Sequence, residues 1–143
     1  MEIRILSGLE AKPLVDPFYE RNRKGHQARK SDLFFVATED QEILGAVRFC
    51  VESGASLLRS LVVDEKHQRK GIGKQLLLEF EKHLNQNRIR SVFCLSDAYL
   101  QNLYEKIGFR MIRNVEAPAF LQERLLEYKN IHPGIRCILL KRP

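Results

Sequence analysis

The amino-acid sequence predicts a mixed α/β (α+β) fold and a single domain over residues 1–143. Short apolar runs rich in β-branched and aromatic residues, such as 33–37 and 57–63, are typical of strands. Segments with apolar residues at helical spacing, most clearly the one after Gly71, alternate with these runs. The length is enough for one full hydrophobic core and too short for two ordinary domains.

The expected elements follow from these patterns in chain order. The expected strands are residues 3–6, 33–37, 43–51, 57–63, 91–96, 109–115 and 135–141. The expected helices are residues 9–22, interrupted near Pro13 and Pro17, a helix after Gly71, a helix over 97–107, and residues 118–128. Polar loops at 38–42 and 52–56 separate neighbouring strands, and the first of them predicts a hairpin. Neither repeats nor low-complexity tracts interrupt this order.

The most informative segment is the turn between the strand ending at Val63 and the next helix. It contains the pattern Gln-x-x-Gly-x-Gly over residues 68–73, and the helix carries Ile72, Leu76, Phe80 and Leu84 on one face. The first N–H groups of a helix have no partners within it, so they can bind an anion. Gly71 and Gly73 allow close approach of the backbone to a ligand. Arg69, Lys70 and Lys74 add positive charge there.

This pattern therefore predicts a diphosphate site, but not one of the two best-known kinds. A Walker loop requires Ser or Thr after the lysine, and Gln75 follows Lys74. A dinucleotide fingerprint requires a third glycine, and Leu76 stands at that position. The alternative for the two glycines is a tight strand-to-helix turn with no ligand.

A second patterned segment follows the strand over 91–96. Asp97 is a good helix N-cap, and Leu100, Leu103, Tyr104 and Ile107 have helical spacing. Gly108 suits the left-handed position that ends a helix. A helical tyrosine in such a stripe is most often a core residue.

Together the two segments resemble the signatures of the GNAT superfamily of acyl-CoA-dependent N-acetyltransferases. The first is Gln/Arg-x-x-Gly-x-Gly/Ala between a strand and a helix, and the second is the helix end Leu-Tyr-Glu-Lys-x-Gly-Phe at residues 103–109. The resemblance is strongest from Leu57 to Phe109. It implies a central mixed sheet of about six or seven mostly antiparallel strands, flanked by helices on both faces. The strands ending at Val63 and near Ser96 are then parallel and splay apart to form the acyl-CoA cleft.

The resemblance also implies roles for individual residues. Leu61, Val62 and Val63 supply backbone to the pantetheine arm of acetyl-CoA, and N–H groups near Leu61 and Val62 stabilise the oxyanion. The implied pyrophosphate contacts are Gln68, Arg69, Lys70, Gly71, Ile72, Gly73 and Lys74. Tyr104 is the implied general acid, because a phenol with a pKa near 10 is protonated at neutral pH and can donate to the leaving thiolate. Asn102 is either a further cofactor contact or part of a solvated helix face.

The sequence does not assign a general base. Many GNAT enzymes carry a glutamate on the strand before the glycine motif, where this chain has no acid and a basic Arg59. Glu52 and His26 are the nearest alternatives, each with an equally good interpretation as a solvated residue. A water chain is a further possibility.

The distribution of charge in the sequence gives an indication of the kind of acceptor. The segment 21–30 holds five Lys and Arg residues and no acid, within a chain of net charge +6. A basic wall favours a small acceptor amine that carries a carboxylate or phosphate, although a solvated loop explains the charge equally well. Nucleic acid is not the expected partner, because no basic strand is interleaved with aromatic residues.

Composition and residue spacing also argue against membrane, secreted and metal-binding classes of protein. No apolar run reaches about 18 residues, and Met1–Arg4 does not begin a signal peptide, so we expect a cytoplasmic protein without a membrane partner. Cys50, Cys94 and Cys137 lie far apart in apolar stretches, which predicts reduced thiols. No His, Cys or carboxylate group has metal-ligand spacing, so we expect no metal.

Three functions are consistent with the sequence. The first is transfer of an acetyl group from acetyl-CoA to the primary amine of a small acceptor, as a monomer or homodimer, and an anionic acceptor is one alternative within this function. The second is acetylation of a peptide N-terminus or lysine. The third is a catalytically silent module that binds acyl-CoA, which the missing strand glutamate favours and Tyr104 disfavours.

Overall fold

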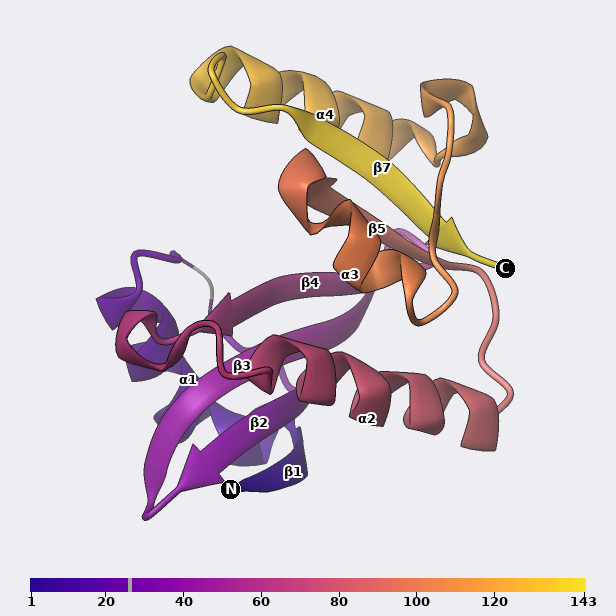
Figure 1. Ribbon diagram of the computed structural model, residues 1–143. Coiled ribbons are helices and arrows are strands. Elements are labelled where there is room, and N and C mark those ends of the chain that lie inside the picture. The colour runs from indigo at the N-terminus through magenta and orange to yellow at the C-terminus, as the bar shows by residue number, and fades with distance from the viewer. Residues whose placement is uncertain (26) are drawn as a thin grey trace.

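The computed structural model describes residues 1–25 and 27–143, and Figure 1 shows its ribbon. The strands are β1 (Glu2–Ser7), β2 (Leu33–Glu39), β3 (Glu42–Glu52), β4 (Ala55–Val63), β5 (Val92–Asp97), β6 (Arg110–Met111) and β7 (Cys137–Arg142). The helices are α1 (Gly8–Arg21), α2 (Ile72–Gln86), α3 (Gln101–Glu105) and α4 (Ala119–Ile131), with short 3-10 turns η1 (Glu65–His67), η2 (Ala98–Leu100) and η3 (Asn114–Glu116).

The described strands form one sheet in the order β1-β2-β3-β4-β5-β7-β6. Neighbours are antiparallel except for the central pair β4 and β5, which is parallel. Two-residue turns connect β2 to β3 and β3 to β4, and the residues in both turns have positive φ, as hairpin turns that match the twist of strands require. The predicted mixed, mostly antiparallel sheet is confirmed.

The central parallel strands separate after a short paired stretch. Their register runs only from Ser56↔Val92 to Leu58↔Cys94. Between the pairs Ala46↔Val62 and Arg48↔Arg59, β4 uses one residue more than β3, which is a β-bulge. Ser60 lies in this bulge with φ 57°, and its carbonyl accepts a hydrogen bond of 2.9 Å from the Tyr19 hydroxyl of α1. The splay predicted for these strands is confirmed, and Figure 1 shows β5 and β7 diverging from β4.

Helices cover both faces of the sheet, because alternate strand residues point in opposite directions. Leu58, Cys94 and Leu140 join one core cluster with the apolar face of α2 and with Tyr104 of α3. On the other face, Val36 and Val62 pack with α1, while Leu57 and Phe93 pack with α4. The helical stripe predicted after Gly71 is fully buried: Ile72, Leu76, Leu77, Phe80 and Leu84.

A buried ion pair lies beneath α1 and was not predicted. Arg48 of β3 and Asp32 are 4% and 0% exposed, and their nearest N and O atoms are 2.6 Å apart. The Asp32 carboxylate also accepts the backbone N–H of Arg29 at 2.8 Å. This pair fixes the segment before β2 to the sheet.

Three predictions about local structure were wrong. Helix α1 is continuous through Pro13 and Pro17, because both prolines lie on its exposed side, where water can satisfy the carbonyls that lose their partners. The strand predicted over 109–115 ends at Met111, after which the chain enters η3. The helix predicted over 97–107 begins as the 3-10 turn η2, and Asp97 makes no capping hydrogen bond.

Candidate active site

A cleft of about 880 Å³ opens where β4 and β5 separate. Its walls are the second half of β4, the turn into α2, the end of β5, α3 and one side of α4. Pairing of β4 with β5 ends at Leu58, so the edge of β4 from Arg59 to Val63 faces the cleft without a strand partner. Unpaired backbone at a strand edge can accept an extended ligand through hydrogen bonds.

The N-terminus of α2 opens onto this cleft. Its N-cap, Gly71, has φ 79°, the first turn of the helix contains no acidic residue, and no side chain caps it. Arg69 also has positive φ, 65°, and the Gln68 side chain donates 3.2 Å to the carbonyl of Val63. The turn therefore leaves free N–H groups beside positive charge, which is the arrangement that binds phosphate.

Most of the residues predicted for the cofactor site line this cleft. They are Leu61, Val62, Val63, Gln68, Arg69, Gly71, Ile72, Gly73 and Lys74, together with Tyr104. Lys70 and Asn102 are exposed and lie outside the lining. The ammonium of Lys70 lies 3.4 Å from Nδ1 of His67 instead.

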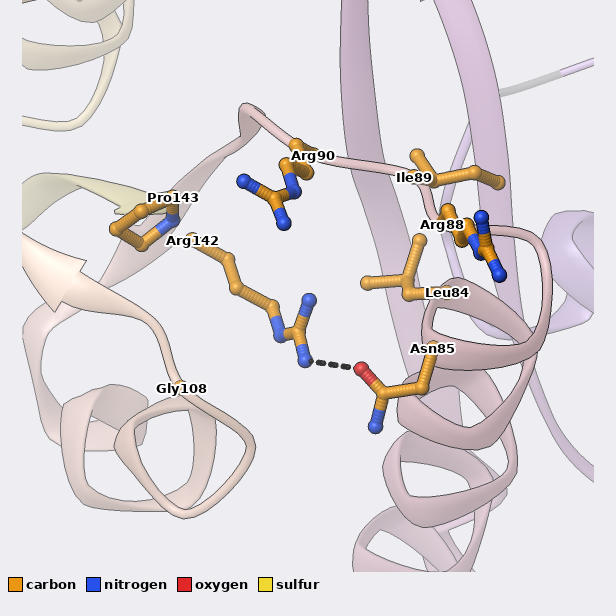
Figure 2. A pocket seen from close by; sticks show the side chains of 8 residues that line it. All are labelled: Leu84, Asn85, Arg88, Ile89, Arg90, Gly108, Arg142 and Pro143. Atoms are coloured by element: carbon orange, nitrogen blue, oxygen red, sulfur yellow. Dashed lines mark hydrogen bonds between the residues drawn. The ribbon is translucent and has the colours of Figure 1, made fainter.

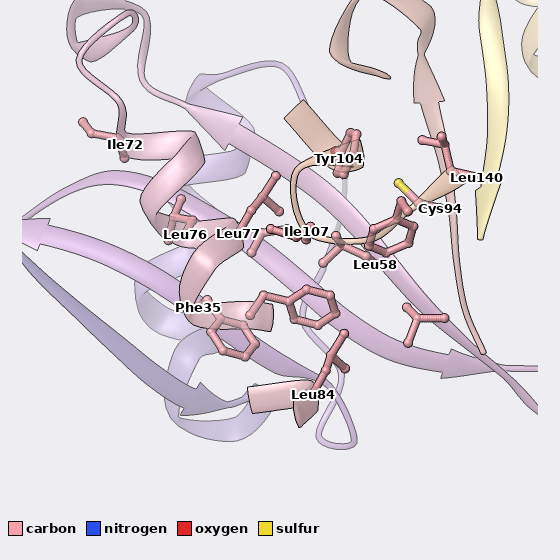
Figure 3. Close-up of a cluster of buried hydrophobic side chains, with 14 of the residues drawn as sticks. Phe35, Leu58, Ile72, Leu76, Leu77, Leu84, Cys94, Tyr104, Ile107 and Leu140 are labelled. Atoms are coloured by element: carbon pink, nitrogen blue, oxygen red, sulfur yellow. The ribbon is translucent and has the colours of Figure 1, made fainter. Parts of the chain in front are cut away.

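Tyr104 lies on α3 at the floor of the cleft and is 4% exposed. Figure 3 shows it in the same buried cluster as Cys94. Burial raises the pKa of its hydroxyl well above the ordinary value of a phenol, and the neighbouring Cys94 raises it further. Its hydroxyl also interacts with the side chain of Ser96. Tyr104 is therefore protonated at neutral pH and can act as a proton donor, whereas a role as base is disfavoured.

Of the two alternatives considered for a base, Glu52 is unsuitable. Its carboxylate is bound by three guanidinium groups: Arg59, Arg124 at 2.7 Å and Arg29 at 3.4 Å. Burial raises the pKa of this carboxyl, but the hydrogen bond from Arg124 and the charges of the three arginines lower it more, so that the net shift is downward. A carboxylate held in this way is a poor proton acceptor. The other alternative, His26, lies outside the described residues.

Sequence reasoning missed a polar group on the wall formed by α4. Arg124 and Tyr128 line the cleft from this helix, and the Tyr128 hydroxyl donates to Oδ1 of Asp97 at 3.2 Å. Asp97 thus binds a side chain 31 residues away instead of capping its own helix. No local sequence pattern indicates that Arg124 and Tyr128 line the cleft or that Tyr128 binds Asp97.

The basic segment 21–30 contributes little to the cleft. Among its described residues, only Asn22 and Lys24 belong to the lining. Arg21 is not part of the lining: it donates to the carbonyl of Ile43 at 3.3 Å and lies 3.7 Å from Asp64. The basic segment therefore forms less of the cleft wall than we expected from its charge.

One group of possible metal ligands occurs in the described part of the chain. Atoms of Glu42, Asp64 and His67 lie within 4.8 Å of one another. Glu42 comes from β3, so sequence spacing gave no sign of the group. The Lys66 ammonium lies 2.8 Å from the Glu42 carboxylate, which already compensates its charge. Ion pairing therefore explains this group.

A second hollow, of about 420 Å³, lies at the other end of α2 (Figure 2). Arg142 crosses it from β7 and donates to Oδ1 of Asn85 and to the carbonyl of Ile107, both at 2.8 Å. Gly108, with φ 98°, lies against the Arg142 side chain, where an added Cβ would come within 3.1 Å of Nε. These contacts tie β7 to the last turn of α2 and to the turn after α3, and we regard the hollow as structural.

Comparison with known proteins agrees with this geometry. The model of the acetyltransferase (GNAT) domain matches residues 10–119. No curated protein matches the sequence. Among solved structures, an acyl-CoA N-acyltransferase from Pseudomonas aeruginosa has a TM-score of 0.69 at 14% identity, covering 99% of each chain. Escherichia coli ElaA has a TM-score of 0.68 at 15% identity, covering 100% of each chain.

A third similar structure is N-acetylglutamate synthase from Neisseria gonorrhoeae, complexed with coenzyme A and N-acetyl-glutamate, with a TM-score of 0.62 at 16% identity. The match covers all of this chain but only 36% of the synthase. At these identities the structures show a shared fold alone.

In the described residues no helix combines the length and apolar character that crossing a bilayer requires. Because the family model spans most of the sequence, the chain belongs to the GNAT acetyltransferase family.

Proposed function

We propose that this protein transfers an acetyl group from acetyl-CoA to the primary amine of a small acceptor. The observation that carries the proposal is the uncapped, positively flanked N-terminus of α2, which opens onto the same cleft as the unpaired edge of β4 and Tyr104. These three features match the three parts of an acyl-CoA molecule in order: the pyrophosphate, the pantetheine amides and the thioester. Family membership and a neighbour complexed with coenzyme A support the same donor.

The pyrophosphate would bind the N–H groups that follow Gly71, with Arg69 and Lys74 beside it. The amides of pantetheine would pair with the edge of β4 at Leu61 and Val63. Gln68 belongs to this unit because its side chain closes the turn onto Val63. Lys70 and Asn102 stay outside the proposed contacts, since neither lines the cleft.

Acyl transfer would proceed by direct attack. The neutral amine donates its lone pair to the thioester carbonyl carbon, and the resulting oxyanion is stabilised by backbone N–H near Leu61 and Val62. The carbon–sulfur bond then breaks, and the departing thiolate takes the proton of the Tyr104 hydroxyl. The proton lost by the amine restores the phenol, through water in the absence of a dedicated base. The products are the N-acetylated acceptor and CoA.

Calorimetry with acetyl-CoA tests the donor site, with dephospho-CoA and pantetheine as competitors. We expect micromolar binding of acetyl-CoA, close to that of dephospho-CoA, and at least about 100-fold weaker binding of pantetheine, which lacks the charge-assisted contacts of the pyrophosphate. Equal affinity for pantetheine would contradict the role of α2. Absence of binding would leave the glycine turn as a purely structural feature.

A catalytically silent acyl-CoA module is the competing function. Release of CoA thiol in the presence of acceptor amines distinguishes the two, because a silent module binds acetyl-CoA without consuming it. Tyr104 favours the enzyme, since a buried phenol that faces the cleft and holds its proton is the group that thiolate departure needs.

A further inference from the structure

The two faces of the sheet present different chemistry to the cleft. Gly71, Gly73 and Tyr104 belong to the face covered by α2 and α3. On the opposite face, Arg59 of β4 and Arg124 of α4 both bind Glu52, since Arg59 follows Leu58 and therefore points to the side of Leu57 and α4. The thioester end of a donor bound from the α2 side would reach the gap between the strands. An acceptor would then approach from the side of the two arginines.

These two arginines belong to a cluster with excess positive charge. Its cations are Arg29, Arg48, Arg59 and Arg124, and its anions are Asp32 and Glu52, which leaves a formal charge of +2 from four cations and two anions. Asp32 is used by Arg48 and Arg29 beneath α1. Arg29, Arg59 and Arg124 then share the single carboxylate of Glu52, so the uncompensated charge falls around this carboxylate, where Arg59 and Arg124 line the cleft and Arg29 does not.

Partial shielding of this excess charge from water favours an anion beside it. The side chains of Arg59 and Arg124 are only 24% and 35% exposed, and both line the cleft. Each guanidinium carries five N–H donors in a fork that fits a carboxylate or phosphate. Only one N–H of each is used by Glu52. Glu52 thus holds the two guanidinium groups in position at the cleft wall and uses only one of the five N–H donors of each.

A negative group lies next to them. Tyr128 follows Arg124 by four residues on α4, so the two side chains are neighbours on one face of the helix. Tyr128 binds the Asp97 carboxylate, which also lines the cleft at the end of β5, one residue after Ser96. The acceptor side therefore presents a cationic group and a carboxylate side by side, close to the strand end where Tyr104 would meet the thioester.

We propose that the acceptor is a small zwitterionic amine whose carboxylate or phosphate binds Arg59 and Arg124 and whose ammonium first binds Asp97. This proposal rests on the proposed function, because it names the acceptor of the same transfer. It assigns specificity to residues on β4 and α4 and not to the basic segment 21–30. Glu52 acts as a positioning residue for the two guanidinium groups and does not contact the substrate.

The test is a set of matched acceptor pairs, with CoA thiol release as the readout. The pairs are glycine and glycinamide, β-alanine and β-alaninamide, phosphoethanolamine and ethanolamine, and 3-aminopropyl phosphate and 3-aminopropanol, and in each pair only the first member carries an anionic group. We expect at least one charged member to react with kcat/KM about 10- to 100-fold above its neutral partner, as charge-assisted hydrogen bonds from two guanidinium groups predict. The first two pairs report a preference for carboxylate and the last two for phosphate. Equal rates within every pair, or no turnover of any charged member, would overturn the proposal.

The variants Arg59→Gln and Arg124→Gln test whether these two side chains cause the preference for the charged acceptor. Each substitution should lower kcat/KM for the charged member of a pair about 10- to 100-fold, mainly by raising KM. The value of kcat/KM for the neutral member should stay nearly unchanged. Lys129→Gln is the matched control, because it removes one positive charge from the same helix at an exposed position outside the cleft. A preference that survives in both arginine variants would refute this assignment.

Acetyl-CoA binding separates this proposal from the one on which it rests. All three variants should keep the affinity of the unmodified protein for acetyl-CoA, since neither arginine is on the α2 side of the cleft. If the unmodified protein binds acetyl-CoA and acetylates neutral amines equally well, only the acceptor assignment fails. If it does not bind acetyl-CoA, the proposed function fails.

Discussion

Replacement of Gly71 by leucine tests the diphosphate site without any knowledge of the acceptor. Gly71 has φ 79°, and an added Cβ would find nothing within 4 Å. The substitution therefore creates no clash inside the protein, and its cost is that of a side chain at positive φ, about 1–2 kcal/mol. In a domain of this size that cost lowers the melting temperature by a few degrees.

Gly54 provides a matched control for this strain. It has φ 80° in the turn between β3 and β4, an added Cβ there also meets nothing within 4 Å, and it lies outside the cleft. Gly54→Leu and Gly71→Leu should therefore lower the melting temperature by similar amounts. Only Gly71→Leu places a side chain in front of the first N–H groups of α2.

The expected difference appears in acetyl-CoA affinity measured by calorimetry. If the leucine displaces the pyrophosphate from two charge-assisted hydrogen bonds of about 1.5 kcal/mol each, the dissociation constant rises by about 100-fold or more. Gly54→Leu should bind as the unmodified protein does. Undiminished affinity of Gly71→Leu, or equal losses in both variants, would refute the assignment of the α2 N-terminus to the pyrophosphate.

The remaining predictions concern catalysis, stability and pH. Tyr104→Phe should lower kcat by about 100-fold or more while leaving the dissociation constant of acetyl-CoA unchanged, and an unaltered kcat would remove Tyr104 from the mechanism. Asp32→Asn should destabilise the fold by about 3–5 kcal/mol in urea unfolding, because it leaves the buried Arg48 charge without its partner; a loss below about 1 kcal/mol would contradict that account. The three arginines lower the pKa of Glu52 below its unfolded value, so its contribution to stability is complete above about pH 4.3 and is lost as the pH falls through the folded pKa. Thermal unfolding between about pH 3 and pH 7 should show this loss in the unmodified protein and not in Glu52→Gln, and parallel curves would refute it.

The parts of the fold that the sequence predicted are those set by local pattern. The stripe on α2, the hairpin strands and the turn at Gly108 each follow from spacing within a few residues, and each is present. The glycine motif was also visible, because strand, turn and helix are contiguous in the chain. Periodicity alone gave no strand order, and the splay of β4 from β5 came from resemblance to a family.

The parts that escaped prediction depend on contacts between distant residues. Asp97 has the local signature of an N-cap, but a hydroxyl from α4 competes for its carboxylate. Arg124 and Glu52 are 72 residues apart, and nothing near either of them indicates their pairing. The proposed acceptor side of the cleft is built almost entirely from such contacts, whereas the proposed donor side is built largely from a contiguous segment. This difference explains why the sequence indicated a donor and left the acceptor open.

The bulge in β4 connects the two sides of the cleft. In a regular strand, residues separated by three positions point to opposite faces, yet Arg59 and Val62 share one face because β4 has an extra residue at Ser60. The same extra residue sends Leu61 and Val63 to the face of α2, where the donor is proposed to lie. Since Tyr19 holds the Ser60 carbonyl, α1 fixes the point at which this exchange of faces occurs. One irregular residue thus lets a single strand present a guanidinium to the proposed acceptor and an open backbone edge to the proposed donor.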